Sequence, residues 1–409
     1  MEGWSLGTSD DVVLLTILAA MLVLLVVGGV ERRRHRARLD ALELRISVNG
    51  SRGKSTVTRL LTSALAEGGF RTLGKTTGTE PKLLFGWNGE EEDIVRRPEG
   101  ANISEQREVV RRAVEAEAEI LVSECMAVKP EYQLTFHREM IDVNLLVICN
   151  ALEDHLDEMG PTVADVAVVF ADSIPEGGKV VVIPEPHVDT YLQVAAQRDC
   201  KVLMAEPEAV TEEQLRGYGY LVLPDHVALV LAVTRELGIP DEVAMRGMRN
   251  AAADPFAMRV VPVGDAQRPG YFVNGFAVND PMSTLAVWEH IAERSLGTDG
   301  LTVIVNCRAD RMDRTTQFAT DVLPHLPIDT LVVTGQQTRP ILRAAANELD
   351  VAEVLDLTGA RADEVVAALN GHLPGRVLYG IGNLHGGGVQ LVEALEDLAI
   401  EDRERRGVA

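Results

Sequence analysis

A glycine-rich stretch near the start of the chain, VNGSRGKST at residues 48–56, restricts the possible folds more than any other feature. An apolar run at residues 44–48 precedes it, and residues 57–67 have helical spacing without a breaker. We therefore expect a strand, a glycine loop and a helix, an arrangement that directs backbone N–H groups and a helix N-terminus at a phosphate. Lys54 would reach the terminal phosphates, and the Ser55 hydroxyl would bind a magnesium ion.

This glycine loop is shorter than the common phosphate-binding form. Its spacing is G-x-x-G-K-S rather than G-x-x-x-x-G-K-[ST], because Val48 stands where the first glycine should be. The alternative interpretation is an ordinary glycine turn with a solvated lysine, and the position between a strand and a helix argues against it. The loop residues that we expect to bind ATP are Asn49, Gly50, Ser51, Arg52, Gly53, Lys54, Ser55 and Thr56.

The length and charge of the chain limit the classes of protein to which it can belong. Its 409 residues suffice for two or three domains with full cores. The formal net charge of −23 argues against a nucleic-acid partner held by a general basic field. If the substrate is anionic, arginines must be concentrated locally.

The four cysteines give no sign of a metal cluster or a disulfide framework. They are scattered without any C-x-x-C pair, at Cys125, Cys149, Cys200 and Cys307. This usage fits a reducing cytoplasm.

A long apolar run at residues 12–30 predicts a membrane anchor. It contains no charged residue, and its length is close to the roughly 20 residues that cross a bilayer as a helix. Residues 31–38 follow it with five arginines, which place the C-terminal side in the cytoplasm. A cleaved signal peptide would carry positive charge before the apolar run instead. We expect a single-pass protein of the cell membrane with a cytoplasmic body.

The remainder of the chain alternates between short apolar strands and helices, which indicates α/β domains with largely parallel sheets. Proline and glycine interrupt the pattern at residues 254–264, where we place a boundary. The predicted order is an anchor at residues 1–40, a central P-loop ATPase domain at residues 41–256 and a Rossmann-like α/β domain at residues 257–409.

Two polar residues follow predicted strands near the glycine loop. Glu124 ends one strand, and His155 comes shortly after another. Ligands of open α/β sheets collect at these carboxyl ends, so both side chains could join Ser55 in holding one or two magnesium ions on ATP. Magnesium prefers oxygen ligands, which makes a histidine unusual. The alternative is that Glu124 caps a helix and His155 belongs to a turn.

Several motifs resemble the Mur ligase superfamily of ATP-dependent amide-bond-forming enzymes. The short glycine loop has the form used in this superfamily, and N-x-x-x-D-H-L-D at residues 150–157 resembles the pattern after its second metal-site strand. Ser-Glu at residues 123–124 and KTTGT at residues 75–79 resemble an acidic strand end and a threonine-rich loop beside the metal. The resemblance implies the catalytic residues Lys54, Glu124 and His155. It implies the metal ligands Ser55, Thr77, Glu124 and His155.

The resemblance continues into the last third of the chain. Residues 273–284 resemble an imperfect D-x-A-H-N-P-x-S segment, in which Asn274 replaces the acidic residue and Val278 replaces the histidine. Residues 306–314 resemble a G-G-D-R-D loop, and residues 378–388 resemble the terminal strand and glycine turn. The further ATP-binding residues implied are Asn279, Asp280, Arg308, Asp310 and Arg311. For the last three, a solvated run of charges remains an equal alternative.

Two differences from the pattern of the Mur ligase superfamily narrow the choice of substrate. Many superfamily members place a carbamylated, metal-bridging lysine after the histidine, but residues 156–178 contain no lysine. The chain also lacks the N-terminal UDP-binding domain of the peptidoglycan ligases and carries a membrane helix instead. Within the superfamily it most resembles the ligase subunits of poly-γ-glutamate synthases, especially at residues 45–61 and 150–162.

This resemblance implies acyl-phosphate chemistry. ATP would phosphorylate a carboxylate, and the amino group of glutamate would then attack, giving an amide, ADP and phosphate. The implied partners are glutamate, growing poly-γ-glutamate and other membrane subunits of the synthase, without nucleic acid. Three alternatives stay open at this point. They are a folylpolyglutamate-type ligase, a membrane-tethered P-loop ATPase that regulates polymer export and a non-catalytic scaffold.

Overall fold

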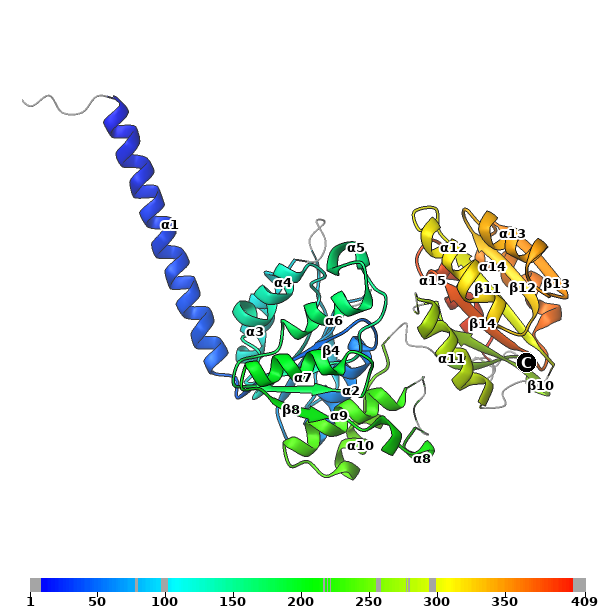
Figure 1. The fold of residues 1–409 in the computed structure, drawn as a ribbon, viewed down its shortest axis with the longest axis horizontal. Helices are drawn as coiled ribbons and strands as arrows, with labels where there is room; N and C mark the ends of the chain where they lie inside the picture. Colours follow the sequence, from blue (N-terminus) through cyan, green and yellow to red (C-terminus); the bar gives the residue numbers. More distant parts are fainter. Residues whose placement is uncertain are drawn as a thin grey trace, which may run out of the picture. The chain divides into compact units, whose positions relative to one another are not determined.

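A computed structural model describes most of the chain, which folds into two compact units. The described residues are 9–77, 80–96, 102–215, 218, 220, 222–254, 259–276, 278, 280–293 and 299–399. Unit 1 comprises Met1–Gln214 and Pro224–Ala252, and unit 2 comprises Leu215–Leu223 and Ala253–Ala409 (Figure 1). The expected boundary between residues 256 and 257 falls outside the described residues, and the exact division stays a prediction.

Unit 1 is built on an eight-stranded sheet of order β4-β3-β2-β5-β1-β6-β7-β8. The strands from β2 to β8 in this order are parallel, and β3 and β4 add an antiparallel hairpin at one edge. The strands are β1 (Leu44–Asn49), β2 (Thr72–Lys75), β3 (Lys82–Phe85), β4 (Glu90–Asp93), β5 (Ile120–Glu124), β6 (Leu145–Ile148), β7 (Lys179–Val182) and β8 (Lys201–Met204).

The central strands of this sheet are buried on both faces, as expected of a parallel sheet covered by helices. The helix α2 (Lys54–Glu67) starts directly after the glycine loop and buries Val57, Leu60, Leu61 and Ala64. The other helices are α3 (Glu105–Glu115), α4 (Pro130–Thr135), the π-helix η1 (Phe136–Met140), α5 (Leu156–Met159), α6 (Val163–Ala171), α7 (Val188–Gln197), η2 (Pro207–Ala209), α8 (Glu212–Leu215), α9 (Pro224–Glu236) and α10 (Asp241–Asn250).

The helix α1 (Ser9–Asp40) carries the apolar run. Its large apolar side chains between residues 12 and 30 are 43–71% exposed, so no protein covers them. Residues Val12–Asp40 form the one helix in the described part of the chain that is long and apolar enough to cross a membrane. The C-terminal end of the same helix packs onto unit 1, where Leu39 joins the core.

Unit 2 has a six-stranded sheet of order β13-β12-β11-β14-β10-β9, parallel except for β9. Its strands are β9 (Val260–Asp265), β10 (Arg268–Asn274), β11 (Leu301–Cys307), β12 (Ile328–Gly335), β13 (Glu353–Thr358) and β14 (Val377–Gly382). Its helices are α11 (Pro281–Glu293), α12 (Met312–Asp321), η3 (Leu323–His325), α13 (Arg339–Asn347), α14 (Ala362–Leu369), η4 (Asn370–His372) and α15 (Gly388–Glu396).

The helices of unit 2 cover both faces of its sheet. Helices α11, α12 and α13 share one core with alternate strand residues, and α14 and α15 share another core with the remaining ones. The chain leaves β11 towards α12 on one face and leaves β14 towards α15 on the other. The neighbouring carboxyl ends of β11 and β14 therefore form a topological switch point, where ligands of such sheets collect. Two units of mixed α/β structure with largely parallel sheets confirm the predicted fold class.

Candidate active site

The glycine loop of unit 1 depends on backbone conformations that favour glycine. Gly50 and Gly53 have φ angles of 126° and 84°, both in the left-handed region. Gly53 is also the N-cap residue of α2. A Cβ atom on Gly53 would lie 2.5 Å from the His226 Nε2 atom, so the loop has no room for a side chain there.

Backbone and side-chain hydrogen bonds hold this loop open. The Gly50 N–H donates to Asn49 Oδ1 at 2.9 Å, and the N–H groups of Ser51 and Arg52 donate to the carbonyl and side chain of Asn150 at 3.0 and 2.9 Å. No side chain caps α2 and no acidic residue occupies its first turn in the described structure. The first N–H groups of this helix and its positive dipole end are therefore available to an anion.

Lys54 lies against this opening. Its Nζ atom donates to the carbonyl oxygens of Gly50 and Ser51 at 2.6 and 3.0 Å. A phosphate oxygen is a stronger partner for an ammonium group than a neutral carbonyl. The loop, the helix end and the lysine together fit a polyphosphate.

An oxygen-rich cluster lies beside the loop at the end of β5. Glu124 is buried, and its Oε2 atom accepts hydrogen bonds from Ser55 Oγ at 2.9 Å and from the Thr77 N–H at 2.8 Å. The parallel register of β1 and β5 pairs Val48 with Glu124, which brings the carboxylate next to the loop. A hydroxyl and a carboxylate are ligands that a hard divalent cation prefers. The structure thus brings Ser55, Glu124 and Thr77 together, as the sequence predicted.

The loop that carries His155 is joined to the glycine loop. Ser51 and Leu152 exchange two hydrogen bonds, Ser51 Oγ to the carbonyl at 3.1 Å and the Leu152 N–H to Ser51 Oγ at 2.9 Å. The Asn150 side chain also donates to the Arg52 carbonyl at 3.3 Å. The motif from Asn150 onward is therefore part of the same site.

His155 itself stands at the outer side of this site. It is the N-cap residue of α5 with a φ angle of 48°, and its side chain is 49% exposed. Its Nε2 atom lies 3.8 Å from Asp154 Oδ1, which in turn lies 3.5 Å from Arg52 Nη2. In the part of the chain that the structure describes, no three His, Cys, Asp or Glu side chains converge on one metal position. Metal ligation by His155 stays a prediction.

A buried polar network beneath the loop was not predicted from the sequence. Asn49 Nδ2 donates to Gln133 Oε1 at 2.9 Å, and the His137 ring contacts the Gln133 carbonyl at 2.7 Å and Ser47 Oγ at 3.0 Å. Burial lowers the pKa of His137 to about 4, so the imidazole is neutral at pH 7. Gln133 and His137 lie 84 and 90 positions along the chain from their partners on β1, and no local motif links them.

Two further buried groups were also missed. His226, at the start of α9, packs against Gly53, and burial lowers its pKa to about 4. Lys75 is fully buried and pairs with Glu105 at 3.0 Å; burial lowers the pKa of the lysine. Lys75 belongs to the KTTGT motif, but neither that motif nor the sequence around His226 indicated that the two side chains are buried.

The predicted ATP-binding residues of unit 2 occupy the ends of its strands and helices. Arg308 binds Asp310 through two contacts of 3.0 and 2.7 Å, and Arg311 is the N-cap residue of α12. Asp280 is buried, and its carboxylate accepts the Ser283 N–H at 2.8 Å, which is a helix-capping contact at the start of α11. Asn279 lies outside the described residues. Nucleotide binding by these residues stays a prediction.

The switch point of unit 2 carries a second glycine turn. Gly386 and Gly387 have φ angles of 76° and 102°, and Gly387 is the N-cap residue of α15 without a side-chain cap. Asn306 and Asn383 exchange hydrogen bonds between their side chains and carbonyls at 2.5 and 3.2 Å, and Arg314 Nη1 donates to Asn383 Oδ1 at 2.9 Å. The Arg308 side chain also lies against Gly386, so this turn combines neutral amides with two arginines.

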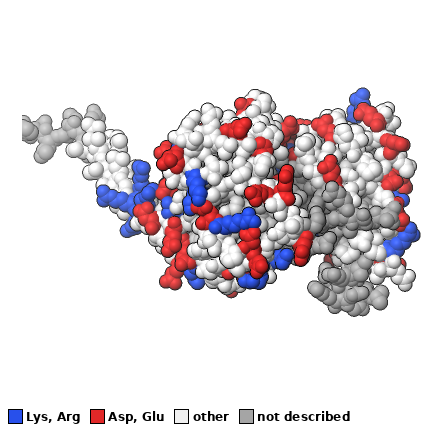
Figure 2. Space-filling model, turned by 60° about the horizontal axis from the view of Figure 1, so that its bottom comes forward, with Lys and Arg blue, Asp and Glu red and all other residues white. Residues whose placement is uncertain are grey.

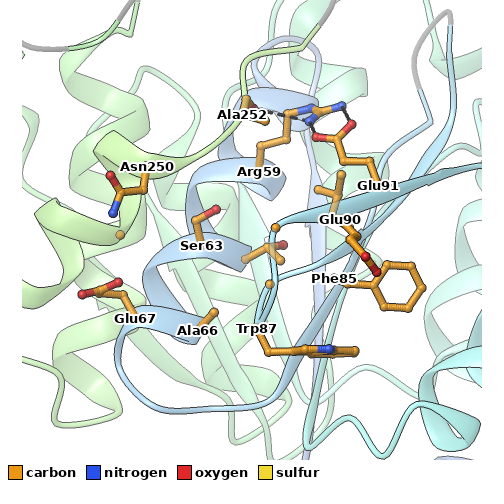
Figure 3. A pocket seen from close by; sticks show the side chains of 15 residues that line it. Arg59, Ser63, Ala66, Glu67, Phe85, Trp87, Glu90, Glu91, Asn250 and Ala252 are labelled. Atoms are coloured by element: carbon orange, nitrogen blue, oxygen red, sulfur yellow. Dashed lines mark hydrogen bonds and ion pairs between the residues drawn. The ribbon is translucent and has the colours of Figure 1, made fainter.

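A cavity of about 330 Å³ in unit 1 is separate from these groups (Figure 3). It lies between α2, the β3–β4 hairpin and α10, and none of the predicted site residues lines it. Three of its charged lining residues are already paired, with Arg59 on Glu91 at 2.5 Å and Glu67 on Arg246 at 2.5 Å. The candidate active site is therefore the open edge of the sheet rather than this cavity.

Comparison with known proteins identifies relatives along nearly the whole chain. Residues 260–398 match the family model described as the poly-gamma-glutamate synthase CapB C-terminal domain. The chain is 44% identical over 373 residues to PGA synthase CapB of Bacillus subtilis (strain 168), covering 91% of this chain and 95% of the relative. It is 43% identical over 377 residues to the capsule biosynthesis protein CapB of Bacillus anthracis, covering 92% of this chain and 81% of the relative.

Solved structures with the same fold are more distant in sequence. Escherichia coli FolC in complex with ADP has a TM-score of 0.63 at 15% identity, covering 92% of this chain and 94% of that chain. MurF from Acinetobacter baumannii has a TM-score of 0.62 at 15% identity, covering 91% of this chain and 80% of that chain. These similarities confirm the predicted Mur-ligase-like fold.

Proposed function

Because the chain belongs to the CapB family of poly-γ-glutamate synthases and is an ATP-dependent amide ligase, we propose that it links glutamate units through their γ-carboxyl groups by way of an acyl phosphate. The family relationship confirms the resemblance predicted from the sequence. The observation that supports the proposed chemistry is the contact of Ser55 with the buried Glu124 carboxylate, directly beside Lys54 and the uncapped start of α2.

The main obstacle to this reaction is electrostatic repulsion. A carboxylate that attacks ATP approaches a group that is already strongly negative. In our proposal, Lys54 and the first N–H groups of α2 hold the phosphates and stabilise the charge that develops on the transferred phosphoryl group. Ser55 and Glu124 hold a divalent cation, with Thr77 and His155 as the further predicted ligands. We propose Mg²⁺, since the ligands in contact here are oxygen atoms.

The proposed reaction has two balanced steps. A γ-carboxylate oxygen attacks the γ-phosphorus of ATP, and the bond from that phosphorus to the ADP oxygen breaks. The amino nitrogen of the second glutamate then attacks the acyl carbon and loses a proton as phosphate leaves. Asn49 to Thr56 would bind ATP in the glycine loop, and Arg308, Asp310, Arg311, Asn279 and Asp280 would bind it from unit 2. Glutamate and the growing polymer are the substrates.

Trapping of the activated carboxylate tests this proposal. Washed membranes that contain the chain are incubated with ATP, glutamate and hydroxylamine, which converts an acyl phosphate into a hydroxamate. We expect glutamyl γ-hydroxamate and ADP from the wild type and neither from Lys54→Met. Lys201→Met is the matched control, because Lys201 is an exposed lysine on β8 that pairs with Glu236.

The same assay separates the alternatives. ADP release that does not require glutamate would favour a regulatory ATPase. Full polymer production by Lys54→Met in cells would favour a scaffold without catalysis. A folylpolyglutamate-type ligase would require a folate acceptor; the FolC structures share only 15% identity and support the fold alone.

We also propose that α1 anchors the protein in the cell membrane with its body in the cytoplasm, where it meets other membrane subunits of the synthase. The support is the exposed apolar surface of α1, which a protein active on soluble substrates does not need. The net charge of −23 supports the absence of a nucleic-acid partner. Removal of residues 1–30 should lower polymer yield in cells, and a normal yield would contradict the anchor's role.

A further inference from the structure

The helix α1 enters unit 1 without a linker. Its apolar run ends at Val30, and the next residue, Glu31, already pairs with Arg107 of α3 at 2.8 Å. A flexible tether would leave several residues without contacts between the span and the body. Here the contacts with the body begin where the apolar run ends.

The end of α1 is fixed to unit 1 by several further contacts. His35 is buried, and its Nε2 atom lies 2.9 Å from the Met140 carbonyl at the end of η1. Arg36 pairs with Asp142 at 3.0 Å. Arg45 Nη1 donates to the carbonyl oxygen of Leu39 at 3.0 Å, which ties the last turn of α1 to the first strand.

This docking determines which surface of unit 1 faces the membrane. Residues 31–40 rise about 15 Å along the helix axis, at about 1.5 Å per residue. The headgroup region adds only several ångströms on each side of a hydrocarbon core of about 30 Å. The surface around α3 and the end of η1 is therefore within reach of the headgroups when residues 12–30 span the bilayer.

The end of α1 carries positive charges that are unpaired among the described residues, although the chain as a whole has a net charge of −23. Arg32, Arg33 and Arg34 are exposed and Arg38 is half-buried, and none of them has an ion-pair partner in the described structure. Figure 2 shows basic side chains gathered where the helix meets the body. An anionic leaflet would repel a chain of net charge −23, except at such a segment.

The acidic groups at the end of α1 are paired, and Asp40 binds Arg36 at 3.2 Å. Glu31 pairs with Arg107, and Asp142 is shared by Arg36 and Arg45 at 3.0 and 3.2 Å. The free charges of the segment are therefore positive. Anionic phospholipid headgroups match this surface in charge and position.

We propose that Arg32, Arg33, Arg34 and Arg38, together with the adjoining side of α3, form a docking surface for anionic phospholipid headgroups. Docking holds unit 1 flat against the cytoplasmic leaflet. The inference rests on the proposed membrane anchor and is independent of the ligase chemistry.

The test measures the distance of unit 1 from the lipid headgroups. The full chain is reconstituted into vesicles of phosphatidylcholine alone or of phosphatidylcholine mixed with phosphatidylglycerol, each with a headgroup-spin-labelled lipid as quencher. A fluorophore is attached at Ser104→Cys, an exposed position at the start of α3, or at Ala209→Cys, an exposed position on η2 as the control. The four native cysteines are buried.

We expect strong quenching at Ser104→Cys in the mixed vesicles and weak quenching at Ala209→Cys. Changing Arg32, Arg33 and Arg34 to Gln should reduce the docked population by about fivefold or more. Raised salt should act in the same direction. The matched control changes three exposed arginines elsewhere to Gln and should have no effect. These arginines are Arg249, Arg343 and Arg361.

Equal quenching in both kinds of vesicle would overturn the proposal. Quenching at Ser104→Cys that persists after Arg32, Arg33 and Arg34 are changed to Gln would also overturn it. Quenching that requires an added membrane subunit would overturn it too, and would identify an acidic protein partner instead of lipid. A chain that does not float with the vesicles would overturn the anchor and this inference together. Hydroxamate formation that requires Lys54 would still support the ligase proposal in that case.

Discussion

Both units lead a parallel strand through left-handed glycines into a helix whose first turn has no side-chain cap, but the surroundings differ. In unit 1, Gly53 precedes Lys54 and Ser55, and the buried Glu124 carboxylate contacts the serine. In unit 2, Gly387 precedes an uncharged helix start, beside paired asparagines and Arg314. The glycine turn of unit 1 thus carries an ammonium group beside a buried carboxylate. The glycine turn of unit 2 carries neutral amides, Arg314 and an Arg308 that is paired with the exposed Asp310.

This difference indicates how one backbone geometry serves different ligands. A helix start attracts any anion. A triphosphate with its metal needs a cation on one side and a hard anionic ligand on the other. In unit 1 these are Lys54 and the buried Glu124 carboxylate, which contacts Ser55. Beside the turn of unit 2, Arg308 is instead paired with the exposed carboxylate of Asp310.

Lys54→Ala should have the largest effect. Loss of a charge aimed at the transferred phosphoryl group should lower kcat of glutamate-dependent ADP release by about 10²–10³-fold. Arg308→Ala in unit 2 should cost about tenfold, since loss of one charge-assisted contact is worth about 1.5 kcal/mol. Steady-state kinetics of ADP release measure both. An equal loss in the two variants would remove the distinction between the turns.

Glu124→Gln should weaken metal activation. Replacement of the carboxylate by a neutral amide should raise the half-saturating Mn²⁺ concentration by about 10–100-fold. Titration of ADP release with Mn²⁺ at saturating ATP measures this shift. Glu208→Gln, an exposed position on η2, is the control. An unchanged Mn²⁺ requirement in Glu124→Gln would place the metal elsewhere.

Gly53→Ala should destabilise the protein more than Gly387→Ala. Both changes force alanine into the left-handed region, at a cost of about 1–2 kcal/mol. At Gly53 the new Cβ also meets His226 at 2.5 Å, whereas nothing lies within 4 Å at Gly387. We expect an extra loss of about 1–2 kcal/mol at Gly53, measured by denaturant unfolding.

Addition of His226→Ala to Gly53→Ala serves as the control for that clash. The double variant should recover the steric part of the loss, although the backbone strain remains. Equal stability of the two single glycine variants would show that the loop of unit 1 relaxes around His226.

Acid should destabilise unit 1 through its buried histidines. The pKa of His137 is about 4 in the folded protein, below the ordinary value of 6.5. The folded state therefore binds fewer protons than the unfolded state, and the stabilisation present above pH 6.5 is lost as the pH falls towards 4. We expect about 1–2 kcal/mol from this residue between pH 7 and pH 5. Denaturant midpoints at both values measure it, and His137→Asn should show a smaller drop.

Much of the candidate site could be predicted because it depends on local sequence and sheet topology. The glycine loop was recognisable from its spacing between a strand and a helix. Glu124 could be placed beside Ser55 because parallel strands present their carboxyl ends at the same edge. His155 lies in the loop that is joined to the glycine loop, but its side chain is 49% exposed and its φ angle is positive, and no local pattern indicated either feature.

The remaining parts of the site could not be predicted from spacing. His226 reaches Gly53, and Gln133 reaches Asn49, from helices far along the chain. The ion pair of Lys75 with Glu105 joins a strand end to a separate helix. Such contacts depend on how helices pack over the sheet, and a single sequence does not encode that packing as a motif.

The α/β class, the phosphate-loop geometry and the long apolar helix were predictable from the amino-acid sequence, because each arises from residues that are neighbours along the chain. The folded protein was needed to show that the glycine loop rests on a buried polar network and that the apolar helix continues into unit 1 without a linker. The physical reason is that burial and ion pairing between distant segments are properties of packed surfaces. They exist only after the helices have covered the sheet.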